Sequence, residues 1–202
     1  MFDKQIFAWT EKPAVTIAAA LRRRGIGADR LTLAGFAAGL AALPLLAGGH
    51  YLWALLFILL NRLCDGLDGV VARLGRTSDR GAFLDVALDF FFYASVPFGF
   101  ALADPEANAL AAAFLLFGFI GTGSSFLALA VLAERQGRRS AEFPTKGVYY
   151  LGGLTEGAET VLAFILMCLL PRSFATIAYA FGALCFVTTV MRWWWGWRLL
   201  SR

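Results

Sequence analysis

The stretch "CDGLDGVVARLGRTSDRGAFLDVALDF", residues 64–90, places four carboxylates between two almost wholly apolar segments. Ionised side chains are costly in or near a bilayer, so a chain that keeps four of them close together is expected to use their charge. The four are Asp65, Asp68, Asp85 and Asp89. Their interpretation depends first on whether the chain lies in a membrane.

The composition is that of a membrane protein. Of the 202 residues, 59% are hydrophobic and 16% are charged, and the mean hydropathy is +0.68. Each of six apolar runs is long enough, at 1.5 Å per residue, to cross a hydrocarbon layer about 30 Å thick. We therefore expect an all-α fold with one membrane domain over residues 1–202. Within residues 31–197, its six transmembrane helices should lie at roughly 31–49, 51–72, 83–103, 107–133, 147–170 and 174–197.

Residues 1–28 have the pattern of an amphipathic helix that lies in the plane of the membrane interface. Apolar side chains recur there at steps of three or four, with charged residues between them. Pro13 is expected to bend or interrupt this helix. The segment lacks the apolar run and the small-residue cleavage site of a signal peptide.

The distribution of Lys and Arg predicts that both termini are cytoplasmic. With the N-terminus inside, sixteen of the eighteen basic residues flank the cytoplasmic ends of helices, leaving Arg172 on the opposite side and Arg62 within a helix. The net charge of +4 then indicates contact with anionic lipid headgroups rather than with nucleic acid. We expect a multi-pass protein of a bacterial inner membrane.

Helical spacing places the carboxylates on two facing surfaces. At 100° per residue, Asp65 and Asp68 differ by about 60° on one helix, and Asp85 and Asp89 by about 40° on the next. If these helices are adjacent and antiparallel, the two faces meet in a crevice near the cytoplasmic side. Residues with small side chains share the same faces and leave room there: Gly69, Ala72 and Gly81.

Four converging carboxylates repel one another unless a cation neutralises them. Their oxygen ligands favour one or two divalent ions, Mg²⁺ or Mn²⁺, which keep coordination positions for substrate phosphates. Such a site is typical of phosphoryl transfer. Arg73 can reach the same opening and add a fixed positive charge for a phosphate. The alternative is an ordinary surface cluster, in which the aspartates pair with Arg73, Arg76 and Arg80.

The order Asp65-x-x-Asp68-Gly69-x-x-Ala72-Arg73, then seven residues, then Gly81-x-x-x-Asp85-x-x-x-Asp89 resembles the signature of the CDP-alcohol phosphatidyltransferase family. The six apolar runs and the interfacial N-terminal helix also resemble that family's architecture. The resemblance thus covers nearly the whole chain. It implies transfer of a phosphatidyl-type group from a CDP-linked lipid, commonly CDP-diacylglycerol, to the hydroxyl of an alcohol, with release of CMP, in phospholipid biosynthesis.

Carried over by position, the resemblance assigns a role to each residue of the signature. It implies that Asp89 is the general base for the acceptor hydroxyl and that the protein forms a homodimer. The implied ligands of two divalent ions are Asp65, Asp68, Asp85 and Asp89. The implied contacts to the CDP moiety are Gly69, Ala72, Arg73 and Gly81.

The signature does not define the acceptor alcohol. Glu156 and Glu159 would lie about 14 to 20 Å deep if the fifth helix begins near Gly147, and acidic residues at that depth are functional candidates. With Lys146 in the preceding loop, they are our candidates for the acceptor pocket. The alternative is that one of the two glutamates forms a structural pair with Arg62.

Other polar or small residues in the apolar runs are interpreted as packing features. Thr122, Ser124 and Ser125 are expected to satisfy backbone carbonyls, and Gly35 and Gly39 to form a small-xxx-small packing pair.

A divalent-cation transporter is the main alternative from another functional class, because it would also use intramembrane carboxylates. A transporter predicts acidic residues spread through the depth of the membrane and an internal repeat. Here the aspartates cluster at one depth, and the chain holds no second copy of their pattern. The sequence therefore favours an enzyme.

Overall fold

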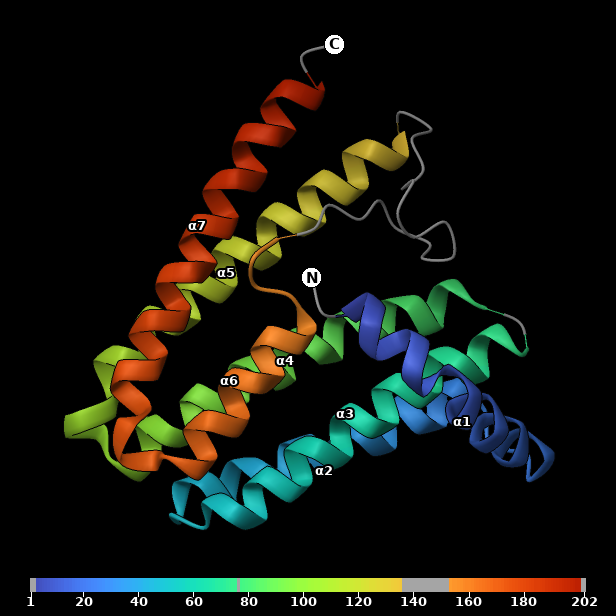
Figure 1. Ribbon diagram of the computed structural model, residues 1–202, viewed down its shortest axis with the longest axis horizontal. Helices are drawn as coiled ribbons and strands as arrows, with labels where there is room; N and C mark the ends of the chain where they lie inside the picture. Colours follow the sequence, from blue (N-terminus) through green and yellow to red (C-terminus); the bar gives the residue numbers. More distant parts are fainter. Residues whose placement is uncertain (1–2, 76, 136–152, 201–202) are drawn as a thin grey trace.

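The computed structural model describes residues 3–75, 77–135 and 153–200, and every regular element in them is helical (Figure 1). The expected all-α class is confirmed for this part of the chain. The helices are α1 (Asp3–Arg23), α2 (Ala28–Ala47), α3 (Tyr51–Arg73), α4 (Asp79–Ala103), α5 (Pro105–Arg135), α6 (Gly157–Leu169) and α7 (Phe174–Leu200), with a 3-10 turn η1 (Pro171–Ser173) before α7.

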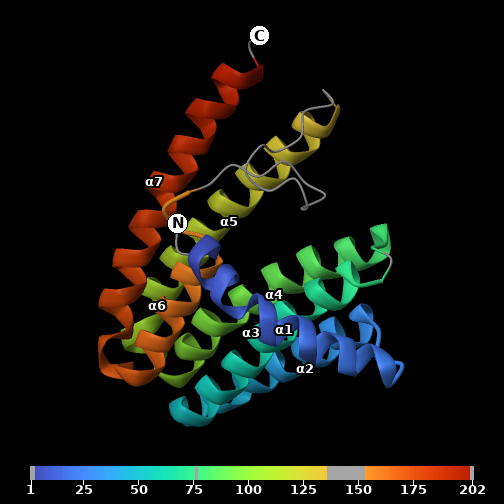
Figure 2. The ribbon, with the colours of Figure 1, turned by 45° about the vertical axis from the view of Figure 1, so that its right-hand side comes forward.

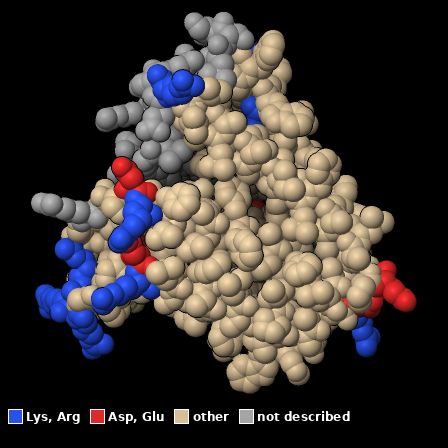
Figure 3. Space-filling model, turned by 180° about the vertical axis from the view of Figure 1, so that it is seen from behind, with Lys and Arg blue, Asp and Glu red and all other residues tan. Residues whose placement is uncertain are grey.

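Four of these helices, α2, α4, α5 and α7, are long and apolar enough to cross a membrane. By contrast, α3 has the length, at 23 residues, but carries Arg62, Asp65 and Asp68 in its second half, and α6 has 13 residues. Figure 3 shows one face of the molecule, where most charged side chains lie towards the margins of a broad tan area and a little red is visible at the bottom of a hollow within it. The helices therefore have the apolar exterior of a membrane protein.

Six helices form a closed ring of contacts. α2 packs on α3, α3 on α6, α6 on α7, α7 on α5, α5 on α4, and α4 returns to α2. The long helices α5 and α7 lie side by side in both ribbon views (Figures 1 and 2). α3 and α4 follow one another in the chain but make little backbone contact, because each packs against α2 instead. The sequence predicted that α3 and α4 are adjacent, but in the structure they lie apart and α2 packs against both of them.

Aromatic side chains fill the centre of this ring. Phe92, Phe100, Phe164 and Phe174 are fully buried and come from α4, α6 and α7. The Phe100 and Phe174 rings stack with centroids 4.4 Å apart, and Phe92 meets Phe164 edge to face at 6.3 Å. Such ring pairs add to the stabilisation from burial. This core fixes α4 relative to the C-terminal helices.

Glycines on α2 let its neighbours approach closely. A methyl group at Gly35 would lie 2.6 Å from Cβ of Cys64 on α3, and one at Gly39 would lie 2.5 Å from the Phe92 ring on α4. Real Cβ contacts are longer, so neither position has room for a side chain. The predicted role of Gly35 and Gly39 in packing is confirmed.

The N-terminal helix α1 lies against the second half of α3. Ala18 on α1 packs with Val70 and Val71 on α3 in a small buried cluster. Val15 and Ile17 are exposed. α1 continues as a helix from Asp3 to Arg23, so Pro13 does not interrupt it, and the expected bend at Pro13 stays a prediction.

The fifth predicted helix, 147–170, is wrong in its first half as far as the structure describes it. Residues 147–152 lie outside the described residues, residues 153–156 are not helical, and α6 begins at Gly157. Glu156 is the N-cap of α6, and Glu159 accepts a hydrogen bond from the backbone N–H of Glu156 at 3.2 Å. This reciprocal capping box sets the start of the helix.

The polar run on α5 satisfies its own backbone, as predicted. The hydroxyl of Thr122 lies 3.1 Å from the carbonyl of Phe119, and those of Ser124 and Ser125 donate to the carbonyls three residues earlier. These hydroxyls therefore need no ligand to explain them.

We expect Gly39→Val to lower the stability of the protein by about 1–3 kcal/mol, because the new side chain must push the Phe92 ring out of the core. Thermal unfolding in detergent measures the change. The matched control is Gly66→Ala on α3, where a methyl group meets nothing within 4 Å. That variant should be as stable as the parent or slightly more so, and an equal loss in both variants would contradict the packing role of Gly39.

Candidate active site

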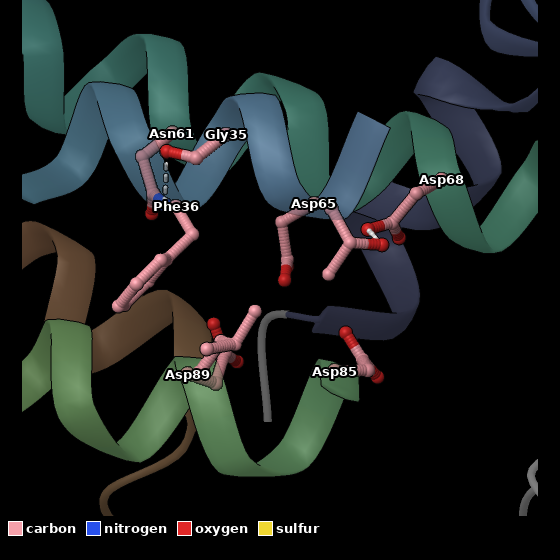
Figure 4. Close-up of a pocket in the computed structure, with 9 residues that line it drawn as sticks. Gly35, Phe36, Asn61, Asp65, Asp68, Asp85 and Asp89 are labelled. Carbon is pink, nitrogen blue, oxygen red and sulfur yellow. Dashed lines mark hydrogen bonds between the residues drawn. The ribbon is translucent and has the colours of Figure 1, made fainter. Parts of the chain in front are cut away.

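The four aspartates of the sequence pattern line one pocket. Figure 4 shows Asp65 and Asp68, on α3, facing Asp85 and Asp89, on α4, across the space between these helices. The pocket has a volume of about 230 Å³, including space open to the outside, which is enough for ions and phosphate groups but not for a whole lipid. We call it the aspartate pocket, and its lining is Thr32, Gly35, Phe36, Asn61, Asp65, Asp68, Asp85, Leu88 and Asp89.

Local sequence sets where each aspartate lies. α4 starts at Asp79 because the hydroxyl of Ser78 accepts a hydrogen bond from the backbone N–H of Gly81 at 3.1 Å and caps the helix. From this start, Asp85 and Asp89 lie one turn apart on one face of α4. α2 also lines the pocket, and Gly35 lets it pack closely against α3 there, because the glycine has no side chain.

An arginine on α3 holds two of the four carboxylates. The Arg62 guanidinium donates to Oδ1 of Asp89 at 2.5 Å and to Oδ2 of Asp65 at 3.4 Å. It also donates to the hydroxyl of Tyr93 at 2.9 Å and to Oδ1 of Asn61 at 2.8 Å. The proposed pairing of Arg62 with Glu156 or Glu159 is therefore replaced by a pairing with the aspartates.

Two neutral side chains order the rest of the pocket. Thr32 on α2 donates to Oδ2 of Asp68 at 2.5 Å, and the Asp68 residue is only 5% exposed. Asn61 donates to the backbone carbonyl of Gly35 at 2.8 Å while its own Oδ1 accepts from Arg62. Through these bonds α2 fixes side chains of α3 on the pocket side.

The donor set fits a hard divalent cation by its chemistry, because four carboxylates from two helices share one pocket. In the described part of the chain, however, no three His, Cys, Asp or Glu side chains stand close enough to hold an ion as they are placed. The reason is visible in the hydrogen bonds, since Arg62 engages Asp65 and Asp89 and Thr32 engages Asp68.

The remaining residues of the signature lie outside the lining of the aspartate pocket. A methyl group at Gly69 would meet only the Arg73 guanidinium, at 3.3 Å, so this glycine leaves open space beside Arg73. At Gly81 a methyl group would come within 3.2 Å of both Oδ1 of Asp29 and the Ser78 hydroxyl that caps α4. Ala72 is half-buried on α3.

The candidate acceptor residues lie at the start of α6 and beyond the described residues. The carboxylate of Glu156 accepts from the backbone N–H of Gly153 at 2.8 Å and, with Glu159, forms the capping box. Their predicted depth assumed a helix from Gly147, which the structure does not have over residues 153–156. Lys146 lies outside the described residues.

A second arginine is buried between helices. Arg192, one of the basic residues that the charge distribution places at the cytoplasmic ends of helices, is only 7% exposed on α7. Its Nη1 donates to the carbonyl of Thr122 on α5 at 2.9 Å. A methyl group at Gly153 would lie 3.3 Å from its Nη2, which puts Arg192 beside the segment that leads into α6.

Thr32 and Asn61 were not found from the sequence, and Arg62 was assigned to other partners. The helical spacing could have indicated Asn61 and Arg62, because they precede Asp65 by four and three residues and so share its face of α3. Thr32 comes from another helix, and only the packing of α2 on α3 brings it to Asp68.

Carboxylates from two helices that meet in one pocket of a helical membrane protein offer oxygen ligands of the kind that phosphoryl-transfer enzymes use. Residues 26–197 match the family model described as CDP-alcohol phosphatidyltransferase. The chain belongs to this family of membrane-embedded transferases of phospholipid biosynthesis and is an enzyme of that class.

Two relatives show the extent of the sequence similarity. The chain is 59% identical over 181 residues to inner membrane protein YnjF of Escherichia coli, covering 90% of this chain and 88% of the relative. It is 40% identical over 104 residues to a phosphatidylinositol phosphate synthase of Streptomyces avermitilis, covering 50% of this chain and 43% of the relative.

The fold matches crystal structures of the Mycobacterium tuberculosis phosphatidylinositol phosphate synthase. The structure with CDP-DAG bound has a TM-score of 0.70 and 22% identity, and the match covers 91% of this chain and 93% of the other. The structure in complex with manganese and citrate has a TM-score of 0.71 and 23% identity, with 91% and 88% covered. At this identity the likeness shows the fold.

We expect Thr32→Val to destabilise the protein by about 1–3 kcal/mol, because it removes the donor to a buried carboxylate without changing the volume of the side chain. Thermal unfolding in detergent measures the loss. Thr32→Ser keeps the hydroxyl and should retain most of the stability. Equal stability of the valine variant and the parent would show that Asp68 does not depend on this bond.

Proposed function

We propose that this chain transfers a substituted phosphoryl group from a CDP-linked lipid, such as CDP-diacylglycerol, to the hydroxyl of an alcohol and releases CMP. The observation that carries the proposal is the aspartate pocket, in which all four aspartates of the family signature meet between α3 and α4. A solved structure of the same fold with CDP-DAG bound supports a CDP-lipid as donor.

In this proposal Asp65, Asp68, Asp85 and Asp89 hold one or two divalent ions, Mg²⁺ or Mn²⁺, as the manganese complex of the related structure supports. When bound, these ions supply positive charge that neutralises the pyrophosphate and the departing CMP. The chain's own small residues leave space for the nucleotide. The residues that contact the CDP moiety are Gly69, Ala72, Arg73 and Gly81.

Asp89 is the proposed general base. Its carboxylate takes the proton of the acceptor hydroxyl as the acceptor oxygen bonds to the lipid-side phosphorus and the bond to the CMP oxygen breaks. Its position supports this role, because it lines the pocket from α4 and is half-buried.

The proposed placement in the membrane has six crossings with both termini in the cytoplasm. Four helices qualify by length and composition, and α3 and α6 complete the ring of contacts between them. α1 lies in the interface, and the whole chain acts as one domain. The name of the Escherichia coli relative supports a bacterial inner membrane. We also propose a homodimer embedded in membrane lipid, with no nucleic-acid partner.

Glu156 and Glu159 remain our candidates for the acceptor pocket, together with Lys146. The buried Arg192 beside Gly153 adds a positive charge to this region. A pocket with both signs of charge suits an alcohol that carries several polar groups.

We expect the purified protein to release CMP from CDP-diacylglycerol in the presence of Mg²⁺ or Mn²⁺ and one member of a panel of alcohols. Asp89→Asn should lower this rate by about 10²–10⁴-fold while CDP-lipid binding persists, because the base is lost but not the pocket. The matched control is Asp104→Asn at the far end of α4, where the side chain caps the backbone N–H of Ala107. Asparagine caps equally well, so that variant should keep full activity. Undiminished turnover by Asp89→Asn would refute the assignment of the base.

We expect Glu156→Gln to change the preference among acceptor alcohols by about tenfold with little loss of stability. The amide oxygen still accepts from the backbone N–H of Gly153, so the start of α6 is kept while the negative charge is removed. Competition between two acceptors in one CMP-release assay measures the preference. An unchanged preference at unchanged stability would mean that Glu156 only caps the helix.

A further inference from the structure

Arg62 occupies the centre of the charge arrangement although it is no part of the family signature. Its side chain is 12% exposed and lies on Phe92 and Tyr93, with its guanidinium carbon 4.6 Å and 4.9 Å from the two ring centroids. Its three guanidinium nitrogens donate four hydrogen bonds. Two of these bonds go to aspartates of the pocket, and two go to neutral oxygens. These ring contacts and hydrogen bonds fix the Arg62 side chain inside the protein, so it is part of the site and not a solvent-exposed charge.

The two charged partners of Arg62 come from different helices. Asp65 lies three residues away on α3, and Asp89 lies on α4. Because α3 and α4 make little backbone contact, the ion pair with Asp89 is a direct link between the two walls of the aspartate pocket. The guanidinium therefore fixes the position of the Asp89 carboxylate relative to α3.

The same two carboxylates are ligands of the divalent cation in the proposed function. Oδ1 of Asp89 and Oδ2 of Asp65 already accept hydrogen bonds from a positive group at 2.5 Å and 3.4 Å. Two cations cannot both approach these oxygens closely, since like charges repel strongly where water is largely excluded.

We propose that Arg62 is a positioning residue that acts as the internal counter-ion of Asp65 and Asp89, and that its guanidinium must leave these two carboxylates before they hold a divalent cation. This inference rests on the proposed function, which places the cation there. Tyr93 and Asn61 hold the guanidinium in the position where it pairs with these carboxylates. Arg62 thus sets how much free metal the site requires.

The test measures Mn²⁺ binding to the full chain in detergent, by titration calorimetry and by the loss of the free-ion electron paramagnetic resonance signal, with no lipid substrate present. Arg62→Met removes the competing charge and keeps an apolar stem against the two rings. We expect its Kd for Mn²⁺ to fall about tenfold. The same variant should be less stable than the parent without Mn²⁺ and should gain more stability when Mn²⁺ is added.

Three further variants keep the test decisive if Arg62→Met does not fold. Tyr93→Phe keeps the ring and the arginine but removes one neutral partner, which loosens the guanidinium, so Mn²⁺ should bind about twofold to threefold more tightly. Arg62→Lys keeps the charge and should bind Mn²⁺ much as the parent does. Arg80→Met removes the exposed arginine of another ion pair, with Asp29, outside the aspartate pocket and should leave Mn²⁺ affinity unchanged.

The outcomes separate this inference from the proposed function. Equal or weaker Mn²⁺ binding by both Arg62→Met and Tyr93→Phe, with normal binding by the parent, overturns the counter-ion role and leaves CMP release untouched. Absence of Mn²⁺ binding by the parent overturns the metal site itself. Tighter binding by the two variants, with Arg80→Met unchanged, supports Arg62 even if no alcohol in the panel stimulates CMP release.

Discussion

The structure depends on how closely α2 packs against both α3 and α4. Gly35 allows Cys64 of α3 to approach, and Gly39 allows the Phe92 ring of α4 to approach, in each case at distances that exclude any side chain on α2. Since α3 and α4 make little backbone contact with each other, α2 sets the separation of the two pairs of aspartates. A packing constraint in the apolar part of the molecule thus determines the width of the polar pocket.

The pocket also brings several charged side chains together in a largely apolar protein. Four ionised carboxylates repel one another across the space between α3 and α4. The guanidinium of Arg62 and the hydroxyl of Thr32 reduce the repulsion from opposite sides of the pocket. These contacts stabilise the pocket when no ion is bound, and in the proposed mechanism those of Arg62 are the ones that rearrange.

Much of this architecture could be predicted from sequence, because long apolar runs in a helical membrane protein have few alternatives. The spacing of the four aspartates predicted their convergence, since helical periodicity alone brings each pair to one face. The start of α6 was missed, because Glu156 and Glu159 suit a buried functional role and a helix cap equally well until the backbone is seen. The partners of Arg62 and the burial of Arg192 depend on contacts between residues far apart in the chain. Local sequence patterns do not reveal such contacts.

The positions of Thr32, Gly35 and Gly39 on α2 have one more consequence. The three residues are separated by three and four positions, so they form a single stripe along the helix that meets Asp68, Cys64 and Phe92 in turn. One inserted or deleted residue between Thr32 and Gly39 would rotate the remainder of α2 by about 100° and turn the stripe away from its neighbours. Natural variation in this helix should therefore consist of substitutions on its outer face, with its length conserved as strictly as its glycines.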